Sequence, residues 1–395
     1  MAKGIVGFII GEGIGEGLEP LTPSVDKPLI RLLGKPLIYY PVANLVELGV
    51  REFYVASGNP GKLTNVLGQF FNEASFEGLR YPGGFERALR SIGDLPRENT
   101  IIVSLGDAIL PRRAYEVALS SHIESGKPIT ILVTPLSDLN GYVGVEVGEM
   151  VHIGRVAEHR PGYAWAGILI ADSDSLKMLR EYGDLNMVFK GLGNNVNVAY
   201  WSGWFTHIIY PWDLLAAVKN LLSTVNEARI SSGAEVSPRA VIEGPVIIDD
   251  EAVIDHGAII RGPSYIGKGA YVGNNALVRN YTSLEEGSIV GADAEVTGSL
   301  VGFKATIGRG SFIGDSVIGD EAVIEPGVVT LNVLPGGVEL THMTPIIIKG
   351  KAMSKLGAVI GPRARIGANT VIYPGAMVEA GRYVQPLTLL KSGGT

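Results

Sequence analysis

The sequence predicts an α/β domain with a doubly wound sheet, followed by a parallel β-helix of six-residue repeats. Strand-like and helix-like segments alternate over residues 1–228, and such alternation is typical of a doubly wound sheet. From residue 229 an apolar residue recurs at every sixth position, which is the period of a hexapeptide solenoid. We therefore expect one domain at 1–228, a second at 229–388 and a tail at 389–395.

The first domain contains five candidate strands and four candidate helices. The strands are short apolar runs at Ile5–Ile10, Phe53–Ala56, Ile101–Leu105, Ile129–Thr134 and Ile168–Ala171. The helices are expected at Ile38–Leu48, Phe85–Ile92, Arg113–Ser125 and Pro211–Leu222. In sheets of this class ligands bind beyond the carboxyl ends of the strands. The loops after Ile10 and Leu105 should therefore face one crevice.

The second domain is indicated by eleven consecutive matches to the six-residue period. The recurring apolar residues are Val236, Ile242, Ile248, Ile254, Ile260, Ile266, Val272, Val278, Leu284, Val290 and Val296. In a solenoid this residue points into a narrow core, and a small residue four positions later fits a corner. The phase slips near Val301 and before Ile318, and after an interruption at Val328–Leu356 the repeat returns at Ile360.

Composition excludes several classes of protein. The chain has no cysteine, which removes disulfides and thiolate chemistry, and its net charge of −7 argues against nucleic acid as a partner. No apolar run reaches the length of a membrane span, and the first residues lack the pattern of a signal peptide. We expect a cytoplasmic protein with neither a nucleic-acid nor a membrane partner.

A glycine-rich segment follows the first strand and carries the most specific motif. Glycines stand at alternate positions, namely Gly11, Gly13, Gly15 and Gly17. Such a loop brings bare backbone N–H groups close to an anion. The dinucleotide and Walker patterns both fail here. Instead the loop is followed by Pro20-Leu21-Thr22, then Lys27-Pro28-Leu29, then Gly34-Lys35-Pro36.

This order of motifs resembles the sugar-1-phosphate nucleotidyltransferases, which join a sugar 1-phosphate to a nucleoside triphosphate. With the repeats, the resemblance extends over nearly the whole chain and is close to archaeal bifunctional nucleotidyltransferase/acetyltransferases. It implies a Rossmann-like mixed sheet, the nucleotidyltransferase fold, followed by a left-handed β-helix of the kind that usually forms trimers. It also implies Mg²⁺ as cofactor, a nucleoside triphosphate or NDP-sugar and a sugar 1-phosphate as ligands, and pyrophosphate as the second product.

The resemblance assigns catalytic roles to Lys27, which matches the lysine on the sugar phosphate, and to Asp107, which matches a metal ligand. Capping of the next helix is the alternative role for Asp107. The substrate-binding positions are Gly11, Gly13, Gly15, Gly144, Glu158, Trp165 and Gly167. For Trp165 the residue type alone favours a place in the core.

Four positions depart from the family pattern. Gly17 stands where the family has arginine, His159 where it has lysine, Trp165 where it has asparagine and His207 where it has an acidic metal ligand. Three of these changes remove charge where phosphate or metal would be contacted. We therefore expect a nucleotidyltransferase-type protein with weak or lost catalysis. The alternative is a non-catalytic regulatory or scaffold paralogue that binds a sugar nucleotide or an active partner subunit, as a homotrimer or a hetero-oligomer.

The interruption of the repeat supports a third interpretation, acyl transfer through the β-helix. In the bifunctional relatives this region carries acetyl transfer, and Asn332, Lys349 and Lys351 agree with the archaeal pattern. However, Arg309 and Phe312 replace the histidine and tyrosine of that pattern. Because an arginine stays protonated, it cannot act as a general base. Acyl transfer is the least favoured of the three interpretations.

Overall fold

The computed structural model describes residues 4–11, 15–22, 26–81, 83–91, 100–182, 184–334, 346–348 and 351–391. The chain divides into two compact units. Unit 1 comprises Met1–Ile14, Lys27–Leu29 and Pro36–His207, and unit 2 comprises Gly15–Asp26, Ile30–Lys35 and Ile208–Thr395. The expected boundary at 228/229 lies inside unit 2, between α7 (Pro211–Leu222) and β14 (Arg229–Ile230).

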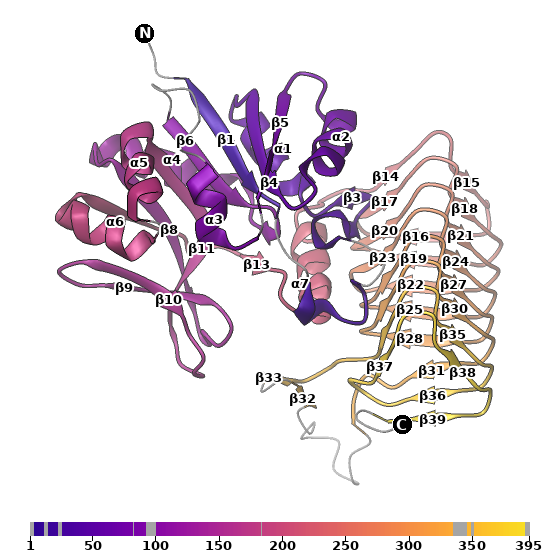
Figure 1. Cartoon of the computed structure of the whole chain (residues 1–395). Helices are drawn as coiled ribbons and strands as arrows, with labels where there is room; N and C mark the ends of the chain where they lie inside the picture. The colour runs from indigo at the N-terminus through magenta and orange to yellow at the C-terminus, as the bar shows by residue number, and fades with distance from the viewer. Residues whose placement is uncertain are drawn as a thin grey trace. The chain divides into compact units, whose positions relative to one another are not determined.

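Unit 1 is built on a nine-stranded mixed sheet (Figure 1). The strands are β1 (Ile5–Ile10), β4 (Glu52–Ser57), β5 (Ser75–Arg80), β6 (Thr100–Leu105), β8 (Ile129–Leu136), β9 (Val143–Val147), β10 (Val151–Arg155), β11 (Gly162–Asp172) and β12 (Val196–Tyr200). The order is β10-β9-β11-β6-β1-β4-β5, and β8 pairs with β11 and β12. Strand β11 runs antiparallel to β6, which makes the sheet mixed as the family resemblance implied.

Helices cover both faces of this sheet. They are α1 (Tyr39–Glu47), α2 (Pro60–Phe70), α3 (Phe85–Arg90), α4 (Arg112–Ser125), α5 (Ser173–Tyr182) and α6 (Leu185–Leu192). Alternate side chains of β1 point to opposite faces. Phe8 therefore packs with Leu89 of α3 and Phe189 of α6, whereas Ile9 packs with Leu45 of α1 and Leu67 of α2. All of these side chains are buried.

The predicted strands of unit 1 lie inside observed ones, and the predicted helices overlap observed ones. Elements missing from the prediction are α2, β5, β9, β10, β12, α5 and α6. Strand β5 lies at the edge of the sheet and is largely exposed, so it has no apolar run to mark it. Among the described residues, no helix has both the length and the apolar character needed to span a bilayer.

Two 3₁₀ turns and a short hairpin complete the N-terminal part, and further short elements follow β6. The 3₁₀ turns are Glu16–Leu18 and Lys27–Leu29, and the hairpin consists of β2 (Arg31–Leu32) and β3 (Lys35–Pro36). Strand β7 (Ala108–Ile109) pairs antiparallel with β13 (Thr206–His207). A third 3₁₀ turn, Gly193–Asn195, follows α6.

Unit 2 is dominated by three parallel sheets of eight strands each (Figure 1). The first contains β14, β17 (Val246–Ile248), β20 (Ser264–Ile266), β23 (Thr282–Leu284), β26 (Leu300–Val301), β29 (Val317–Ile318), β34 (Val359–Ile360) and β37 (Met377–Val378). The second contains β15 (Glu235–Val236), β18 (Val253–Ile254), β21 (Tyr271–Val272), β24 (Ile289–Val290), β27 (Thr306–Ile307), β30 (Val323–Ile324), β35 (Arg365–Ile366) and β38 (Tyr383–Val384). The third contains β16 (Val241–Glu243), β19 (Ile259–Arg261), β22 (Leu277–Arg279), β25 (Glu295–Thr297), β28 (Phe312–Gly314), β31 (Val329–Thr330), β36 (Val371–Ile372) and β39 (Leu389–Leu390).

This arrangement is consistent with the predicted left-handed β-helix. The recurring apolar residues form its core, because Ile248 pairs with Ile266 in the next coil, and Ile266 with Leu284. The register then shortens, since Leu284 pairs with Val301 and Val301 with Ile318. These two coils are one residue shorter than the coils before them, which explains the phase slips in the sequence. An antiparallel pair, β32 (Ile346–Ile348) and β33 (Lys351–Met353), interrupts the repeat.

A buried carboxylate holds the β2–β3 hairpin within unit 2. Glu285 is 1% exposed, and its two oxygens accept hydrogen bonds from the backbone N–H groups of Leu33 and Gly34, each 2.8 Å long. The hydroxyl of Ser283 donates a third bond of 2.7 Å. Leu33 and Gly34 both have positive φ, so the tight turn presents two N–H groups in the same direction. Glu285 therefore anchors this turn.

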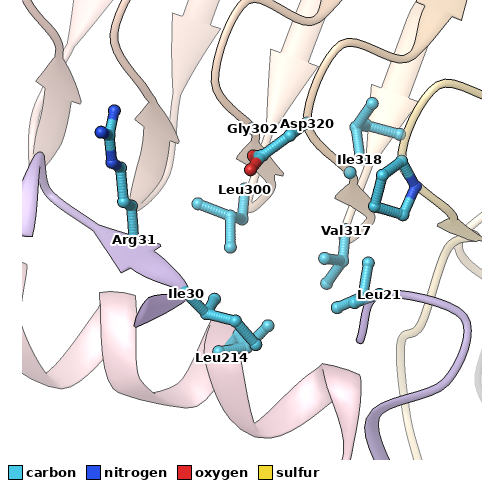
Figure 2. Close-up of a pocket in the computed structure, with 11 residues that line it drawn as sticks. Leu21, Ile30, Arg31, Leu214, Leu300, Gly302, Val317, Ile318 and Asp320 are labelled. Atoms are coloured by element: carbon cyan, nitrogen blue, oxygen red, sulfur yellow. The ribbon is translucent and has the colours of Figure 1, made fainter. Parts of the chain in front are cut away.

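A small pocket in unit 2 lies beside the same hairpin (Figure 2). Its apolar lining includes Leu21, Ile30, Leu214, Leu300 and Val317, and its polar lining includes Arg31 and Asp320. Its accessible volume is about 30 Å³. That volume suits ordered water rather than a nucleotide or a sugar.

Candidate functional site

Two glycines close the carboxyl edge of the sheet in unit 1. The N–H of Gly11 donates to the Ala56 carbonyl and the N–H of Gly106 donates to the Ile10 carbonyl, each over 2.9 Å. A Cβ at Gly11 would lie 2.5 Å from a methyl group of Leu63, so a larger residue there would require the Leu63 side chain to move. Gly13 lies outside the described residues. Gly15 belongs to unit 2 and has a φ of 71°.

Asp107 follows Gly106 and lies at the centre of a buried cluster of charges. Lys27, from the 3₁₀ turn Lys27–Leu29, forms an ion pair with Oδ2 of Asp107. His207 reaches the other carboxylate oxygen, because the pairing of β13 with β7 places His207 opposite Ala108. Its Nε2 lies 3.4 Å from Oδ1 of Asp107. Lys27 and Asp107 are each only 8% exposed.

The charges around Asp107 control its ionisation. Burial by itself raises the pKa of a carboxyl group, but the charges of His207 and Lys27 outweigh burial and hold the pKa of Asp107 well below its usual range. Asp107 is therefore a carboxylate at neutral pH. A buried carboxylate of this kind depends on its partners, because without them its desolvation is not offset.

The donor set of this cluster does not fit Mg²⁺. Magnesium takes oxygen ligands in octahedral geometry, and here an ammonium and an imidazole occupy the two oxygens of Asp107. Within the described residues, no group of three histidine, aspartate or glutamate side chains is placed to hold a metal ion. Capping of α4 does not occupy Asp107 either, since the residue before that helix is Pro111.

The positions expected near the sugar lie in different surroundings. Gly144 lies in β9, where a Cβ would come within 2.6 Å of Val156. Gly167 has a φ of 81° at an irregularity of β11, and a Cβ there would lie 3.0 Å from Ala108, the residue after Asp107. Glu158 is exposed. Gly167 is thus the one of these three that the structure places beside the Asp107 turn.

Trp165 is a core residue in the structure. It is 6% exposed, and its indole N–H donates to the carbonyl of Ile168 over 2.9 Å. Its ring lies edge-on to Phe85, with centroids 4.8 Å apart. Because its one polar atom is bonded inside the protein, a contact with substrate would have to use the ring alone. Its place in substrate binding stays a prediction.

Two residues that depart from the family pattern have local partners. His159 is exposed, and its ring nitrogens lie 3.0 Å from Asp138 and 3.2 Å from the Asn140 amide. Gly17 faces the backbone of Ile209, and a Cβ at Gly17 would lie against that carbonyl oxygen, closer than real Cβ contacts occur. An arginine at position 17 would therefore require the backbone to shift.

Tyr142 is a residue of this region that the motif comparison missed. Its ring centroid lies 6.2 Å from the rings of both His207 and Phe205. Tyr142 stands in the segment Gly141–Val147, which resembles the sugar-side segment of the family, so its position in sequence was a usable signal.

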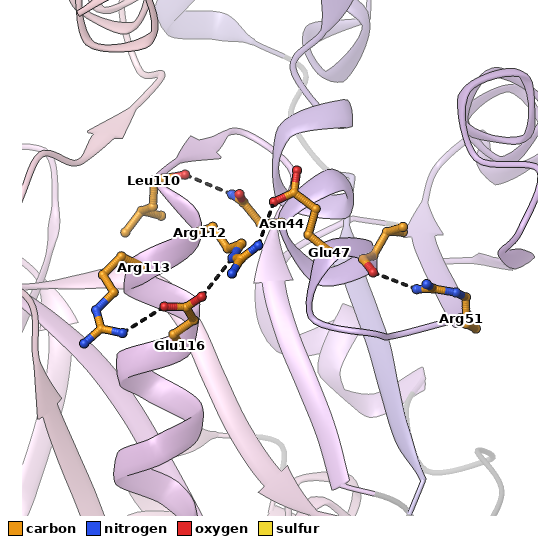
Figure 3. A network of polar contacts seen from close by, with 8 residues as sticks. Asn44, Glu47, Arg51, Leu110, Arg112, Arg113 and Glu116 are labelled. Carbon is orange, nitrogen blue, oxygen red and sulfur yellow. Dashed lines mark hydrogen bonds and ion pairs between the residues drawn. The ribbon is translucent and has the colours of Figure 1, made fainter. Parts of the chain in front are cut away.

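Near the Asp107 turn, Arg112 of α4 pairs with Glu47 of α1 over 3.5 Å (Figure 3). The Asn44 amide donates to the carbonyl of Leu110 over 2.9 Å, next to β7. The hydroxyls of Tyr115 and Ser104 are 2.9 Å apart and fully buried. Arg112 and Arg113 both pair with Glu116 at the surface, at 2.8 and 2.9 Å. The contacts of Ser104 and Leu110 therefore hold both ends of the segment that carries Asp107.

The candidates for acyl transfer lie in unit 2. The Asn332 amide donates to Asp315 over 2.6 Å, and burial raises the pKa of that carboxyl group. Lys349 lies outside the described residues. Lys351 begins strand β33, but its side chain is also outside what the structure describes.

The comparisons with known proteins agree with this architecture. A family model described as nucleotidyl transferase matches residues 6–161, and one described as the GMPPB C-terminal domain matches 241–335. A bifunctional sugar-1-phosphate nucleotidylyltransferase/acetyltransferase of Sulfurisphaera tokodaii is 29% identical, covering 96% of this chain and 95% of the relative. A bifunctional protein GlmU of Methanocaldococcus jannaschii is 26% identical, covering 95% and 92%.

A mannose-1-phosphate guanyltransferase of Gibberella zeae is 30% identical, and the match covers 82% of this chain and 95% of the relative. The match to this guanyltransferase covers most of both domains, and so do the matches to the two archaeal proteins. Together with the sheet of unit 1 and the β-helix of unit 2, these matches show that the chain belongs to the family of sugar-1-phosphate nucleotidyltransferases that carry a C-terminal β-helix.

Proposed function

We propose that unit 1 binds a sugar nucleotide or a sugar 1-phosphate at the carboxyl edge of its sheet, and transfers nucleotidyl groups weakly or not at all. The observation that carries this proposal is the buried cluster of Lys27, Asp107 and His207. An ammonium has three N–H donors. Among the described residues Asp107 is the one partner of this ammonium, which leaves two N–H groups for phosphate oxygens.

The chemistry of transfer explains why turnover should be weak. The oxygen of the sugar phosphate attacks the α-phosphorus in line, and negative charge gathers on the leaving pyrophosphate. A preorganised cation at such a charge is typically worth about 10²–10³-fold in rate. In this chain the family's cationic position is Gly17, and the Ile209 carbonyl fills the space beside it. The chain is therefore suited to hold a sugar nucleotide rather than to make one.

Calorimetry with several NDP-sugars and nucleoside triphosphates tests the binding part of this proposal. We expect tighter binding of the NDP-sugar than of the matching triphosphate with Mg²⁺. Lys27→Gln should weaken NDP-sugar binding by about tenfold, because a charged hydrogen bond is lost. Lys190→Gln, at an exposed position of α6, is the matched control and should bind as the wild type does.

A pyrophosphate-release assay on the same preparation tests the catalytic part. We expect no turnover or very slow turnover with each pair of sugar 1-phosphate and triphosphate. Turnover above about 1 per second, which is ordinary for an enzyme, would contradict the proposal and would require a cation other than the one lost at Gly17.

We also propose that the protein works in the cytoplasm as a trimer associated through the β-helix. The outward positions of the third sheet are mostly apolar, namely Val241, Ile259, Leu277, Phe312, Val329, Val371 and Leu389. Glu295, which pairs with Arg279, interrupts this ladder between Leu277 and Phe312. An apolar ladder on either side of such a pair is suited to a protein contact. Light scattering of the full chain measures its mass, and a concentration-independent monomer would contradict the trimer.

A further inference from the structure

We infer that Asp107 is closed to divalent metal ions and that the ammonium of Lys27 supplies the resident positive charge of this site. Phosphate-bearing ligands would then bind without a metal. The statement about ligands rests on the proposed function, whereas the statement about the metal rests on the cluster alone.

The first support is that both oxygens of Asp107 are already engaged. Lys27 is paired with one oxygen, and Nε2 of His207 lies 3.4 Å from the other. A metal ion would have to displace the ammonium, and it would then face that ammonium across a short distance in a buried site. Like charges repel more strongly where water is excluded. The lysine and the metal therefore compete for one carboxylate.

The second support is the identity and position of His207. The pairing of His207 with Ala108 holds His207 beside Asp107. A carboxylate at position 207 would provide oxygen ligands for a metal next to those of Asp107. An imidazole offers one nitrogen instead, and Mg²⁺ and Mn²⁺ prefer oxygen. A metal that accepts nitrogen would still find only two donors, since the described residues provide no third acidic or histidine group there.

The third support is the rigidity of the cluster. Lys27 is 8% exposed and its turn is tied to α1, because the N–H of Ile38 donates to the Pro28 carbonyl over 3.1 Å. Asp107 is held by the strands β6 and β7 on either side of it. The ammonium is therefore preorganised, and its two other N–H groups could donate hydrogen bonds to a phosphate with little rearrangement. The site has a fixed monovalent cation where its relatives' pattern provides for a metal.

Manganese titration of the full chain tests the closure of Asp107. The free Mn²⁺ signal in electron paramagnetic resonance reports binding without any nucleotide and without any activity. We expect no saturable site in the wild type. His207→Asp restores a second carboxylate, and we expect it to gain one equivalent of bound Mn²⁺. The matched control, His207→Asn, is polar but adds no carboxylate and should gain none.

A double variant locates the gained site. Asp107→Asn combined with His207→Asp should lose the manganese that His207→Asp alone gains. The inference is overturned if the wild type binds one equivalent that Asp107→Asn removes. If His207→Asp gains no more than His207→Asn does, the role given to His207 is wrong and the ion pair with Lys27 alone closes Asp107.

Calorimetry in the presence of EDTA or of excess Mg²⁺ tests the statement about ligands. For an NDP-sugar we expect the two dissociation constants to agree within about twofold, and weakening beyond about tenfold in EDTA would overturn metal-independent binding. Absence of any sugar-nucleotide binding would refute the proposed function instead. The manganese titration would still decide whether Asp107 is closed.

Discussion

Asp107 in unit 1 and Glu285 in unit 2 are both buried carboxylates, but their partners differ in charge. Asp107 is bonded by the side chains of Lys27 and His207. The hydrogen-bond donors to Glu285 are all neutral. They are the N–H groups of Leu33 and Gly34 and the hydroxyl of Ser283. The pKa values of the two carboxyl groups are therefore shifted in opposite directions. The pKa of Asp107 is lowered, whereas burial raises the pKa of Glu285 to about 7 in spite of its three hydrogen bonds.

Because of this difference in partners, the surroundings of Asp107 can bind a ligand, whereas Glu285 serves as a structural anchor. An ammonium has donors left over after it pairs with one carboxylate, so Lys27 can bind a phosphate as well. Each backbone N–H has a single hydrogen, and those of Leu33 and Gly34 are used by Glu285. Glu285 therefore fixes the hairpin turn and has no donor to offer a ligand.

Removal of the cation from Asp107 should have the largest effect on stability. Lys27→Met leaves a buried carboxylate with His207 as its remaining partner, and breaking a buried pair in this way typically costs about 3–5 kcal/mol. Urea unfolding at pH 7, followed by circular dichroism, measures the loss. The effect should diminish as pH falls below 3.8, because a lowered pKa gives a contribution that is present above that pH and lost below it.

The double variant Lys27→Met with Asp107→Asn is the control for this prediction. It removes both charges and should recover most of the lost stability. If the double variant is as unstable as Lys27→Met alone, the packing of the lysine stem, rather than the unpaired charge, explains the loss.

The pH dependence of stability should show the next largest effect, with the opposite sign. A carboxyl group whose pKa rises from 4.5 to about 7 on folding stabilises the protein fully below pH 4.5, and this contribution is lost as pH rises to about 7. The lost contribution amounts to about 3 kcal/mol. Over this range Asp107 is ionised in both the folded and the unfolded state, so it adds no slope.

The measured quantity is the difference between wild type and Glu285→Gln in urea unfolding, from pH 4.5 to pH 8. Other groups titrate in the same range, and His122, whose pKa is lowered by burial, has the opposite slope. Such contributions cancel in the difference. A difference that stays constant with pH would show that Glu285 is ionised throughout and that its hydrogen bonds outweigh burial.

The sequence was sufficient to predict the fold where structure repeats or alternates. The six-residue period identified the β-helix, and even its phase slips correspond to the two short coils that end at Val301 and Ile318. Strand β5 was missed because it is largely exposed and has no apolar run. Helices α5 and α6 were missed although the buried residues of α6, Leu185, Val188 and Phe189, do have helical spacing. The contact between Glu285 and the hairpin turn could not be predicted either, since no local sequence pattern connects Leu33 to a residue of a distant coil.

The candidate site could be predicted in its components but not in its contacts. Motif spacing identified Lys27, Asp107 and His207, each as a separate position. Their cluster depends on the pairing of β7 with β13, two short strands that no apolar run marks. The obstruction beside Gly17 depends likewise on Ile209, which lies far from Gly17 in the sequence.

The smallest effect is expected where a carboxylate has two cations but is not buried. Glu116 pairs with Arg112 and Arg113, whose hydrogen bonds lower its pKa, and both arginines are exposed (Figure 3). Arg113→Met makes the same kind of change as Lys27→Met, because it removes one cation from a carboxylate with two partners. Water and Arg112 can replace the lost contact, and exposed pairs contribute little. The urea midpoint should therefore match that of the wild type within error. A loss as large as that of Lys27→Met would mean that the number of partners, and not burial, determines what an ion pair contributes in this protein.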